Sequence, residues 1–261
     1  MKSLGRIGII GGSGWLGSAI AQSLVTSGKV APADLICSYR SAMPGPVSWR
    51  LTKDNAELAS VSDVIILSVR PQDWAAVDIA APDKLVVSVM AGIALRTIGE
   101  RTQSRRLART LPNAAAEVGF SYTPIFVDSP QTGDEDIVRA IFETCGAVDA
   151  VADEDQIDYF TGLSGSGPAF PALLAEAMLK AAQSAGIPAD IARRGAMQTL
   201  IGAGRLLETE RRPPSEVVKT FVDYGGTTAA AILTMREKGF DEAVLAGLEA
   251  AYGKAKALSG P

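Results

Sequence analysis

Short apolar runs alternate with longer mixed stretches over the first 150 residues of this chain. The strand candidates lie at residues 7–10, 35–37, 64–69, 85–89, 107–109 and 147–151. Each has the length of a strand, and the stretches between them provide room for helices or loops. Buried strands that alternate with helices are typical of a parallel sheet covered by helices on both faces. The pattern therefore predicts an α/β domain whose ligand binds at the carboxyl ends of the strands.

The pattern changes after residue 153, where alanine, leucine and charged residues dominate and no convincing strand follows. Helices are predicted over residues 160–183 (with a break at 165–168), 188–207, 215–222, 228–238 and 241–258. We therefore predict two domains, an α/β domain over residues 1–157 and an all-helical domain over residues 158–261. Several of these helices carry apolar residues on more than one face, which favours burial against a second subunit and a homo-oligomer.

The first strand candidate leads directly into a glycine-rich turn. Residues 6–17 read RIGIIGGSGWLG, and a helix-forming stretch follows at 18–24. In this context glycines allow a tight turn and a close approach of the backbone to a pyrophosphate, while the next helix directs its free N–H groups and positive dipole end at the charge. The motif therefore predicts a dinucleotide-binding site that is formed by Gly12, Ser13, Gly14, Trp15, Leu16 and Gly17.

The end of the second strand candidate favours a phosphorylated ribose. In NAD sites, an acidic residue about 20 residues beyond the glycines accepts the ribose 2′-hydroxyl. This sequence instead has Ser38-Tyr39-Arg40-Ser41 at that place, without a carboxylate. Arginine binds phosphate oxygens in a fork, and the serines add neutral donors. NADPH is therefore the favoured cofactor. The alternative is NADH, with Arg40 merely exposed.

Composition excludes several kinds of chemistry. The 261 residues include no histidine, which excludes an imidazole base, the usual catalytic triad and a histidine-bound metal. Cys37 and Cys145 form no CxxC motif, so we expect no metal site and interpret them as buried thiols in a reducing compartment. A net charge of −4 argues against nucleic acid or an anionic membrane as partner. Without a spanning apolar run or a signal-peptide pattern, a cytoplasmic location is expected.

With these motifs described, the whole chain resembles the pyrroline-5-carboxylate reductase family. The segments that carry the resemblance are, in order, GIIG at 8–11, SDVIILSVRPQ at 62–72, SVMAG at 88–92, RTLPN at 109–113, LSGSGPAF at 163–170, EA at 176–177 and GGTT at 225–228. The resemblance implies a Rossmann-like, doubly wound N-terminal domain and an all-helical C-terminal dimerisation domain, whose partner completes the active site. It also implies hydride transfer from NAD(P)H to a cyclic imine, with 1-pyrroline-5-carboxylate reduced to L-proline.

The resemblance also assigns individual residues. For the cofactor it implies, besides the glycine turn, Ser38, Arg40, Asn55, Val69, Arg70, Pro71, Ala91, Gly92 and Asn113. For the substrate it implies Gly226, Thr227 and Thr228, with Glu154 at a more peripheral position. Thr228 is the candidate catalytic residue, because its hydroxyl can orient the imine nitrogen and relay a proton from water, although it is too weakly acidic to act alone.

The residue pattern itself supports this substrate segment. Residues 225–228 precede an apolar helix, so free N–H groups and a positive dipole end converge there and favour a small carboxylate. In the alternative interpretation, Thr227 or Thr228 is only an N-cap of that helix.

Three departures from the family pattern leave the substrate open. The glycine turn is one residue longer, and Arg70 replaces a lysine. Asp223-Tyr224 stands where the family has Ser-Pro. An ionised Asp223 would repel a substrate carboxylate in a closed site, so its side chain points away or the substrate differs. As a further hypothesis, the carboxylate of Asp223 stabilises the iminium cation.

Three alternative functions follow. One is a reductase of another cyclic imine, either 1-pyrroline or pyrroline-2-carboxylate. Another is a non-catalytic NADPH-binding regulatory protein. A deazaflavin-dependent NADP oxidoreductase would fit GGSG at 11–14 but not the motifs at 164–168 and 225–228.

Overall fold

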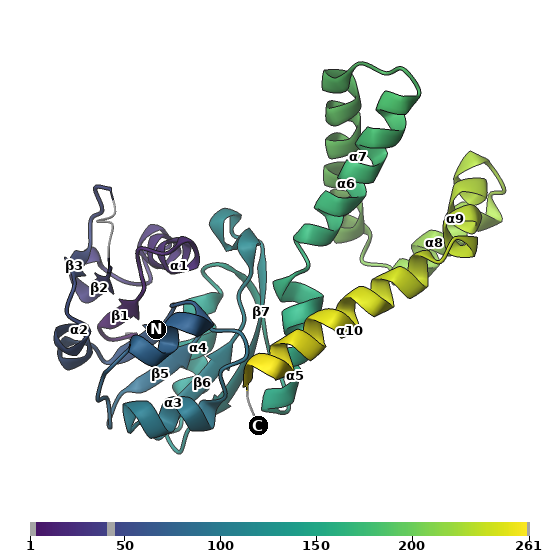
Figure 1. Ribbon diagram of the computed structural model, residues 1–261. Helices are drawn as coiled ribbons and strands as arrows, with labels where there is room; N and C mark the ends of the chain where they lie inside the picture. Colours follow the sequence, from purple (N-terminus) through teal and green to yellow (C-terminus); the bar gives the residue numbers. More distant parts are fainter. Residues whose placement is uncertain (1–3, 41–44, 260–261) are drawn as a thin grey trace. The chain divides into compact units, whose positions relative to one another are not determined.

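The computed structural model describes residues 4–40 and 45–259, which form two compact units (Figure 1). The first unit contains the described residues up to Ser166 together with those from Ala250 onward, and the second contains Gly167–Glu249. The predicted order of an α/β region followed by a helical region is confirmed. A domain division after residue 157 stays a prediction, and this residue lies within helix α5 (Glu154–Phe160).

An eight-stranded sheet forms the centre of the first unit, in the order β3-β2-β1-β4-β5-β6-β7-β8. The strands are β1 (Ile7–Ile10), β2 (Leu35–Ser38), β3 (Arg50–Thr52), β4 (Val64–Leu67), β5 (Leu85–Ser88), β6 (Arg106–Thr110), β7 (Ser121–Asp128) and β8 (Gly146–Ala150). β1 lies between β2 and β4, so the strand order changes direction at β1. Ligands of open α/β sheets bind at the carboxyl ends of the strands beside such a switch point.

The sequence pattern predicted six of these strands, and the structure corrects the expectation of an entirely parallel sheet. β6 and β7 pair antiparallel, with Leu107 opposite Asp128. Residues 111–120 connect them, which is shorter than the dozen or so residues that a parallel crossover needs. The pattern missed β7 because Pro124 lies inside it, and it missed β3 because that strand spans only three residues.

Helices cover both faces of the sheet. Alternate residues of β4 belong to different hydrophobic clusters, Val64 and Ile66 to one and Ile65 and Leu67 to the other, because side chains alternate across a strand. The first cluster includes residues of α1 (Trp15–Thr26) and α4 (Asp134–Phe142). The second includes residues of α2 (Asn55–Val61), the 3₁₀ helix η2 (Pro71–Ala76) and α3 (Leu95–Thr102). The unit is therefore doubly wound.

Helices form the second unit. They are α6 (Ala169–Ser184), α7 (Ala189–Glu210), α8 (Pro214–Asp223), α9 (Thr227–Glu237) and α10 (Phe240–Ser259), whose last part belongs to the first unit. The predicted helices are confirmed to within a few residues. A π-helical turn at Thr161–Gly165 precedes α6, where the sequence predicts an interruption.

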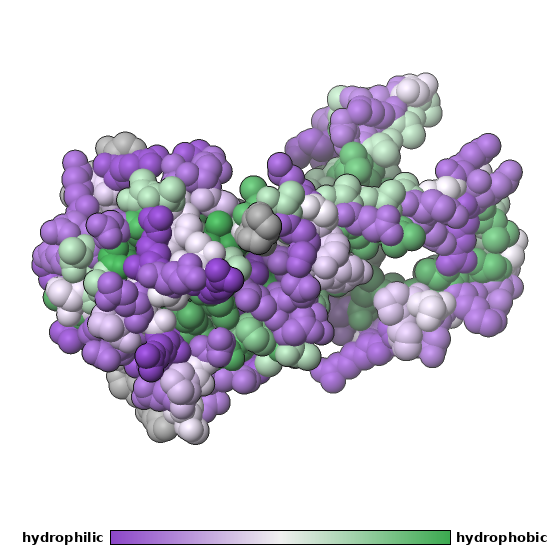
Figure 2. Space-filling model, turned by 60° about the horizontal axis from the view of Figure 1, so that its bottom comes forward, coloured by the Kyte–Doolittle hydropathy of each residue, from purple (hydrophilic) through white to green (hydrophobic). Residues whose placement is uncertain are grey.

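Large apolar side chains of the second unit remain exposed. Leu173 is 66% exposed and Leu245 is 57% exposed, whereas the buried apolar residues among those described in this unit are alanines. Figure 2 shows hydrophobic side chains on the surface of these helices. Such an apolar surface is typical of a protein that packs against another protein.

Within residues 4–40 and 45–259, no helix is both long enough and apolar enough to cross a bilayer.

Candidate functional site

An open pocket of about 810 Å³ lies at the carboxyl ends of β1, β2, β4 and β5. Its lining residues are Ile10, Gly11, Ser13, Gly14, Trp15, Leu16, Ser38, Tyr39, Arg40, Lys53, Asn55, Ser68, Val69, Arg70, Asp73, Ala76, Val77 and Val89. This volume is within the usual range for small-molecule sites. The pocket lies at the switch point of the sheet, where the topology places a ligand.

The glycine turn closes on itself through its backbone. Gly14 N–H donates to the Gly11 carbonyl at 2.9 Å, and α1 begins immediately afterwards with Gly14 as its N-cap. Gly11 has a φ of +79°, and an added Cβ there would lie 2.7 Å from the Ser68 carbonyl oxygen. A Cβ on Gly17 would lie 2.6 Å from the Gly11 oxygen. The backbone is therefore packed so closely that side chains have no room.

This turn fits a pyrophosphate. The first residues of α1 line the pocket, no acidic side chain lies in its first turn, and its N-terminal N–H groups are unused within the helix. The structure refines the sequence prediction in one respect. Gly12 and Gly17 support the turn from behind rather than line the pocket, while Gly11, which the prediction did not include, lines it directly.

A charged cluster lies at the β2 end of the pocket. Arg40 Nη1 donates to Asp73 Oδ1 at 3.2 Å, and Arg70 Nε donates to Asp73 Oδ2 at 2.7 Å. These hydrogen bonds, first from Arg70 and then from Arg40, lower the pKa of Asp73. Lys53 lies 5.4 Å from the centre of the Tyr39 ring, a cation–π contact. Three cationic side chains and one carboxylate therefore line this end, which leaves it positive.

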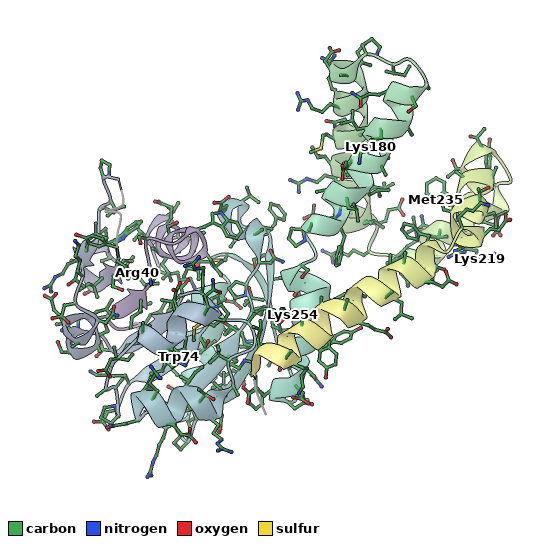
Figure 3. The ribbon with its side chains drawn as sticks, viewed as in Figure 1. Arg40, Trp74, Lys180, Lys219, Met235 and Lys254 are labelled. Atoms are coloured by element: carbon green, nitrogen blue, oxygen red, sulfur yellow. The ribbon has the colours of Figure 1, made fainter. Side chains whose placement is uncertain are left out.

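Ser38 has a supporting role in the same region. Its side chain is buried, and its hydroxyl accepts a hydrogen bond from Gly11 N at 3.2 Å, which joins the end of β2 to the glycine turn. Arg40 is labelled in Figure 3. Ser41 lies outside the described residues. Asn55, Val69 and Arg70 line the pocket, and their contact with cofactor stays a prediction.

Sequence reasoning missed several lining residues. Lys53 follows β3, a strand that the pattern did not indicate, and no role was predicted for Tyr39 between Ser38 and Arg40. Asp73 belongs to η2, three residues after Arg70. The signal in the sequence that could have identified Asp73 is its position three residues after Arg70, close enough for an ion pair.

Other predicted cofactor residues lie at the same edge of the sheet but outside the pocket lining. Pro71 begins η2, and Ala91 and Gly92 follow β5. Gly92 has a φ of +67°, and a Cβ there would lie 2.5 Å from Leu258 Cβ, so the end of α10 packs directly on this turn. Asn113 follows β6 and is buried.

Both ends of the Asn113 side-chain amide form hydrogen bonds to neighbouring backbone groups. Its Oδ1 accepts from Ala115 N, and its Nδ2 donates to the Ser164 carbonyl, each at 2.9 Å. Asn113 therefore connects the loop after β6 to the π-helical turn and positions this edge of the sheet. A direct contact with cofactor stays a prediction.

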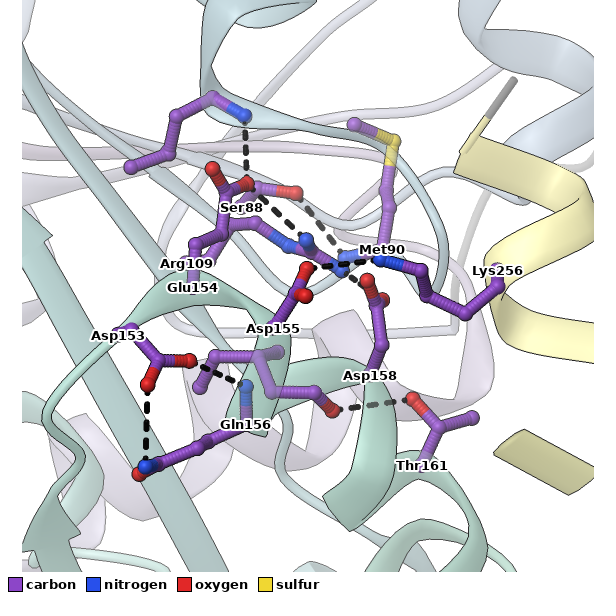
Figure 4. A network of polar contacts seen from close by, with 12 residues as sticks. Ser88, Met90, Arg109, Asp153, Glu154, Asp155, Gln156, Asp158, Thr161 and Lys256 are labelled. Carbon is purple, nitrogen blue, oxygen red and sulfur yellow. Dashed lines mark hydrogen bonds and ion pairs between the residues drawn. The ribbon is translucent and has the colours of Figure 1, made fainter. Parts of the chain in front are cut away.

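Glu154 belongs to a buried ionic network (Figure 4). Its Oε1 accepts from Leu95 N, the first residue of α3, at 2.7 Å and from Arg109 Nη1 at 3.0 Å. Arg109 Nη2 also donates to Asp158 Oδ1 at 2.6 Å, and both of these side chains are almost fully buried. These contacts give Glu154 a role in joining α3, β6 and α5. Its peripheral role toward substrate stays a prediction.

Four of the five predicted substrate residues lie in the second unit, at the corner between α8 and α9, whereas Glu154 lies in the first unit. Gly226 is the N-cap of α9, Thr227 and Thr228 are its first residues, and both threonines are exposed. The capping alternative is wrong, because the N-cap is a glycine without a capping side chain. Asp223 ends α8, and its Oδ2 accepts from Lys219 Nζ at 2.5 Å.

Comparisons with known proteins agree with this architecture. A family model described as pyrroline-5-carboxylate reductase dimerisation matches residues 154–258, and one described as NADP oxidoreductase coenzyme F420-dependent matches residues 6–92. A pyrroline-5-carboxylate reductase of Synechocystis is 33% identical over 97% of this chain and 98% of its own.

Solved structures are similar over the full length. A pyrroline-5-carboxylate reductase of Coxiella burnetii, 26% identical, has a TM-score of 0.85 and covers 99% of this chain and 100% of its own. A pyrroline carboxylate reductase of Plasmodium falciparum with NADP bound, 23% identical, also has a TM-score of 0.85, with both chains covered completely, and supports the fold. Because a sequence identity of 33% extends over 97% of this chain, the chain belongs to the pyrroline-5-carboxylate reductase family.

Proposed function

We propose that this protein is an NADPH-dependent reductase of a cyclic imine, which converts 1-pyrroline-5-carboxylate to L-proline. The observation that carries the proposal is the glycine turn and helix N-terminus at the head of a positively charged pocket, in a chain of this family. NADH is the less favoured cofactor, because no carboxylate follows β2.

In this proposal the pocket holds the dinucleotide. The N–H groups of Ser13, Trp15 and Leu16 bind the pyrophosphate, and Arg40, Lys53 and Arg70 bind the 2′-phosphate. Ser38 fixes the turn, while Ala91, Gly92 and Asn113 shape the sheet edge further along. NADPH, when bound, supplies a hydride.

The start of α9 receives the substrate in this proposal. The N–H groups of Thr227 and Thr228 and the helix dipole attract the substrate carboxylate, with Gly226 allowing close approach. The Thr228 hydroxyl orients the imine nitrogen and relays a proton from water, because a protonated imine accepts a hydride more readily. The ion pair with Lys219 offsets the charge of Asp223, which supports a substrate that carries a carboxylate.

We also propose a homodimer or larger homo-oligomer that is formed through the helical unit. The exposed apolar side chains of that unit and the match to a dimerisation model support this. A cytoplasmic location is a further proposal, supported by the two buried free thiols Cys37 and Cys145.

The test is NADPH consumption with 1-pyrroline-5-carboxylate, pyrroline-2-carboxylate and 1-pyrroline side by side. The proposal expects the highest kcat/KM with 1-pyrroline-5-carboxylate and a large loss of kcat in Thr228→Val, with Thr234→Val in the same helix as a control. A higher kcat/KM with one of the other two imines would identify that imine as the substrate in place of 1-pyrroline-5-carboxylate. Tight NADPH binding without consumption of any imine would instead indicate a regulatory protein.

Asp223 needs its own comparison, because it is the departure that most affects the substrate. Both Asp223→Asn and Asp223→Ser remove the carboxylate; the first keeps the size of the side chain, and the second restores the serine of the family pattern. If the Asp223 carboxylate stabilises the iminium cation, we expect a lower kcat in both variants. Unchanged turnover and substrate preference in both would exclude that role.

A further inference from the structure

Asp73 connects two walls of the dinucleotide pocket. Arg40 follows β2, whereas Arg70 and Asp73 belong to the segment after β4, and these strands lie on opposite sides of β1. The Asp73 carboxylate uses one oxygen for Arg40 and the other for Arg70. Among the described residues that line the pocket, Asp73 is the one that carries a carboxylate, and it engages the two guanidinium groups that suit a phosphate.

The segment that carries Asp73 is firmly held. Arg101 Nη1 donates to the carbonyls of Ala75 at 2.8 Å and Val77 at 3.1 Å, and its guanidinium lies 5.3 Å from the centre of the Trp74 ring. Trp74, labelled in Figure 3, is buried in the core under η2. The Asp73 carboxylate is thus presented from a fixed backbone.

We propose that Asp73 weakens the preference for NADPH over NADH by competing with the 2′-phosphate for Arg40 and Arg70. This inference rests on the proposed binding of a dinucleotide but not on the identity of the imine. NADH carries a neutral hydroxyl at that position, so Asp73 opposes NADPH alone. The residue therefore narrows the difference in affinity between the two cofactors.

Physical reasoning gives the direction of the effect. Like charges a few ångströms apart repel, and a phosphate ester carries up to two negative charges at neutral pH. Loss of Asp73 also frees both guanidinium groups for the phosphate. The opposing effect is the loss of order in the arginines, which is small because exposed ion pairs contribute little.

The test measures binding by calorimetry with NADP⁺ and NAD⁺ on the intact protein. In Asp73→Asn, we expect the Kd for NADP⁺ to fall roughly five- to tenfold and that for NAD⁺ to change less than about twofold. Glu100→Gln is the matched control, since Glu100 is an exposed carboxylate paired with Arg96 outside the pocket lining. It should leave both Kd values unchanged.

The outcomes separate the inference from the function. An unchanged or raised Kd for NADP⁺ in Asp73→Asn, with wild-type binding intact, would overturn the inference alone. Equal changes for NADP⁺ and NAD⁺ would also overturn it, because the effect would not involve the 2′-phosphate. If the wild-type protein binds neither nucleotide, both the cofactor assignment and this inference are overturned. If the protein binds NADP⁺ but reduces no imine, the binding experiment still tests the role of Asp73.

Discussion

Replacing Asp134 with asparagine should destabilise the sheet unit strongly, and only where this carboxyl group is ionised. Asp134 is the first residue of α4 and is 1% exposed. Its carboxylate accepts from Arg106 Nε at 2.9 Å, Arg106 Nη2 at 2.7 Å and Ser129 Oγ at 2.5 Å. The positive end of the α4 dipole further favours a negative charge there. The pair joins β6 to α4.

The structure sets the magnitude. Breaking a buried ion pair costs about 3–5 kcal/mol, because the remaining charge is left without compensation. Arg106 is 20% exposed and keeps a hydrogen bond to the Asp83 carbonyl at 3.0 Å. We therefore expect Asp134→Asn to lower the free energy of unfolding by about 2–3 kcal/mol, which is less than the loss of a completely buried pair. Glu135→Gln is the control on the same helix, since Glu135 pairs with Arg139 at the surface and should cost at most about 0.5 kcal/mol.

The pH dependence has a definite sign. Burial raises the pKa of Asp134, but hydrogen bonds from Arg106 and Ser129 outweigh it, so the pKa in the folded protein is lowered. A lowered folded pKa gives stability that is present above the unfolded value, about 3.9, and is lost as the pH falls through the folded value. The difference in the free energy of unfolding between wild type and Asp134→Asn should therefore be constant near neutral pH and shrink below about pH 4.

Urea unfolding followed by tryptophan fluorescence provides the assay, because Trp15, Trp49 and Trp74 all lie in the first unit. The free energy of unfolding is compared for wild type and both variants from neutral to acidic pH. The reasoning fails if Asp134→Asn costs no more than Glu135→Gln. It also fails if the cost persists undiminished at strongly acidic pH.

Two further predictions concern the pocket. Gly17→Ala should weaken binding of NADP⁺ and NAD⁺ by about tenfold or more, because its Cβ would meet backbone atoms of Gly11 and Gly12 at 2.6 and 2.9 Å. Calorimetry checks this against Gly195→Ala, where nothing lies within 4 Å of the added Cβ, and equal affinities would contradict it. Arg101→Met should raise both Kd values by similar factors, because η2 loses its carbonyl contacts, and a selective loss of NADP⁺ alone would count against that explanation.

Local patterns predicted most of the fold because its signals are local. The run Ile7–Ile10, the glycine turn and the helix after it are contiguous, so one short stretch of sequence specifies a complete phosphate site. Most ends of the helices in the second unit lie beside glycines or prolines, which act on neighbouring residues; the end of α7, where Arg211 is the C-cap, is an exception.

Contacts between distant segments could not be predicted in the same way. Nothing in the sequence near Arg40 indicates that Asp73 lies 3.2 Å away, because that contact depends on β2 and β4 flanking the same strand. Glu154 is similar, since the Arg109 and Leu95 groups that it contacts lie 45 and 59 residues away. The strand order therefore determines which charged side chains meet at the dinucleotide pocket, whereas the local sequence determines the backbone conformation of its glycine turn.

Both segments proposed to bind anions already contain a carboxylate paired with a cation. At the corner of α8 and α9, Asp223 and Lys219 cancel each other, so attraction there comes from the N–H groups and dipole of α9. In the pocket, Asp73 offsets only part of the charge of Arg40, Arg70 and Lys53. Because exposed ion pairs are weak, neither pair prevents an incoming anion from binding. The two paired carboxylates therefore control which anion each segment prefers more than whether it binds one.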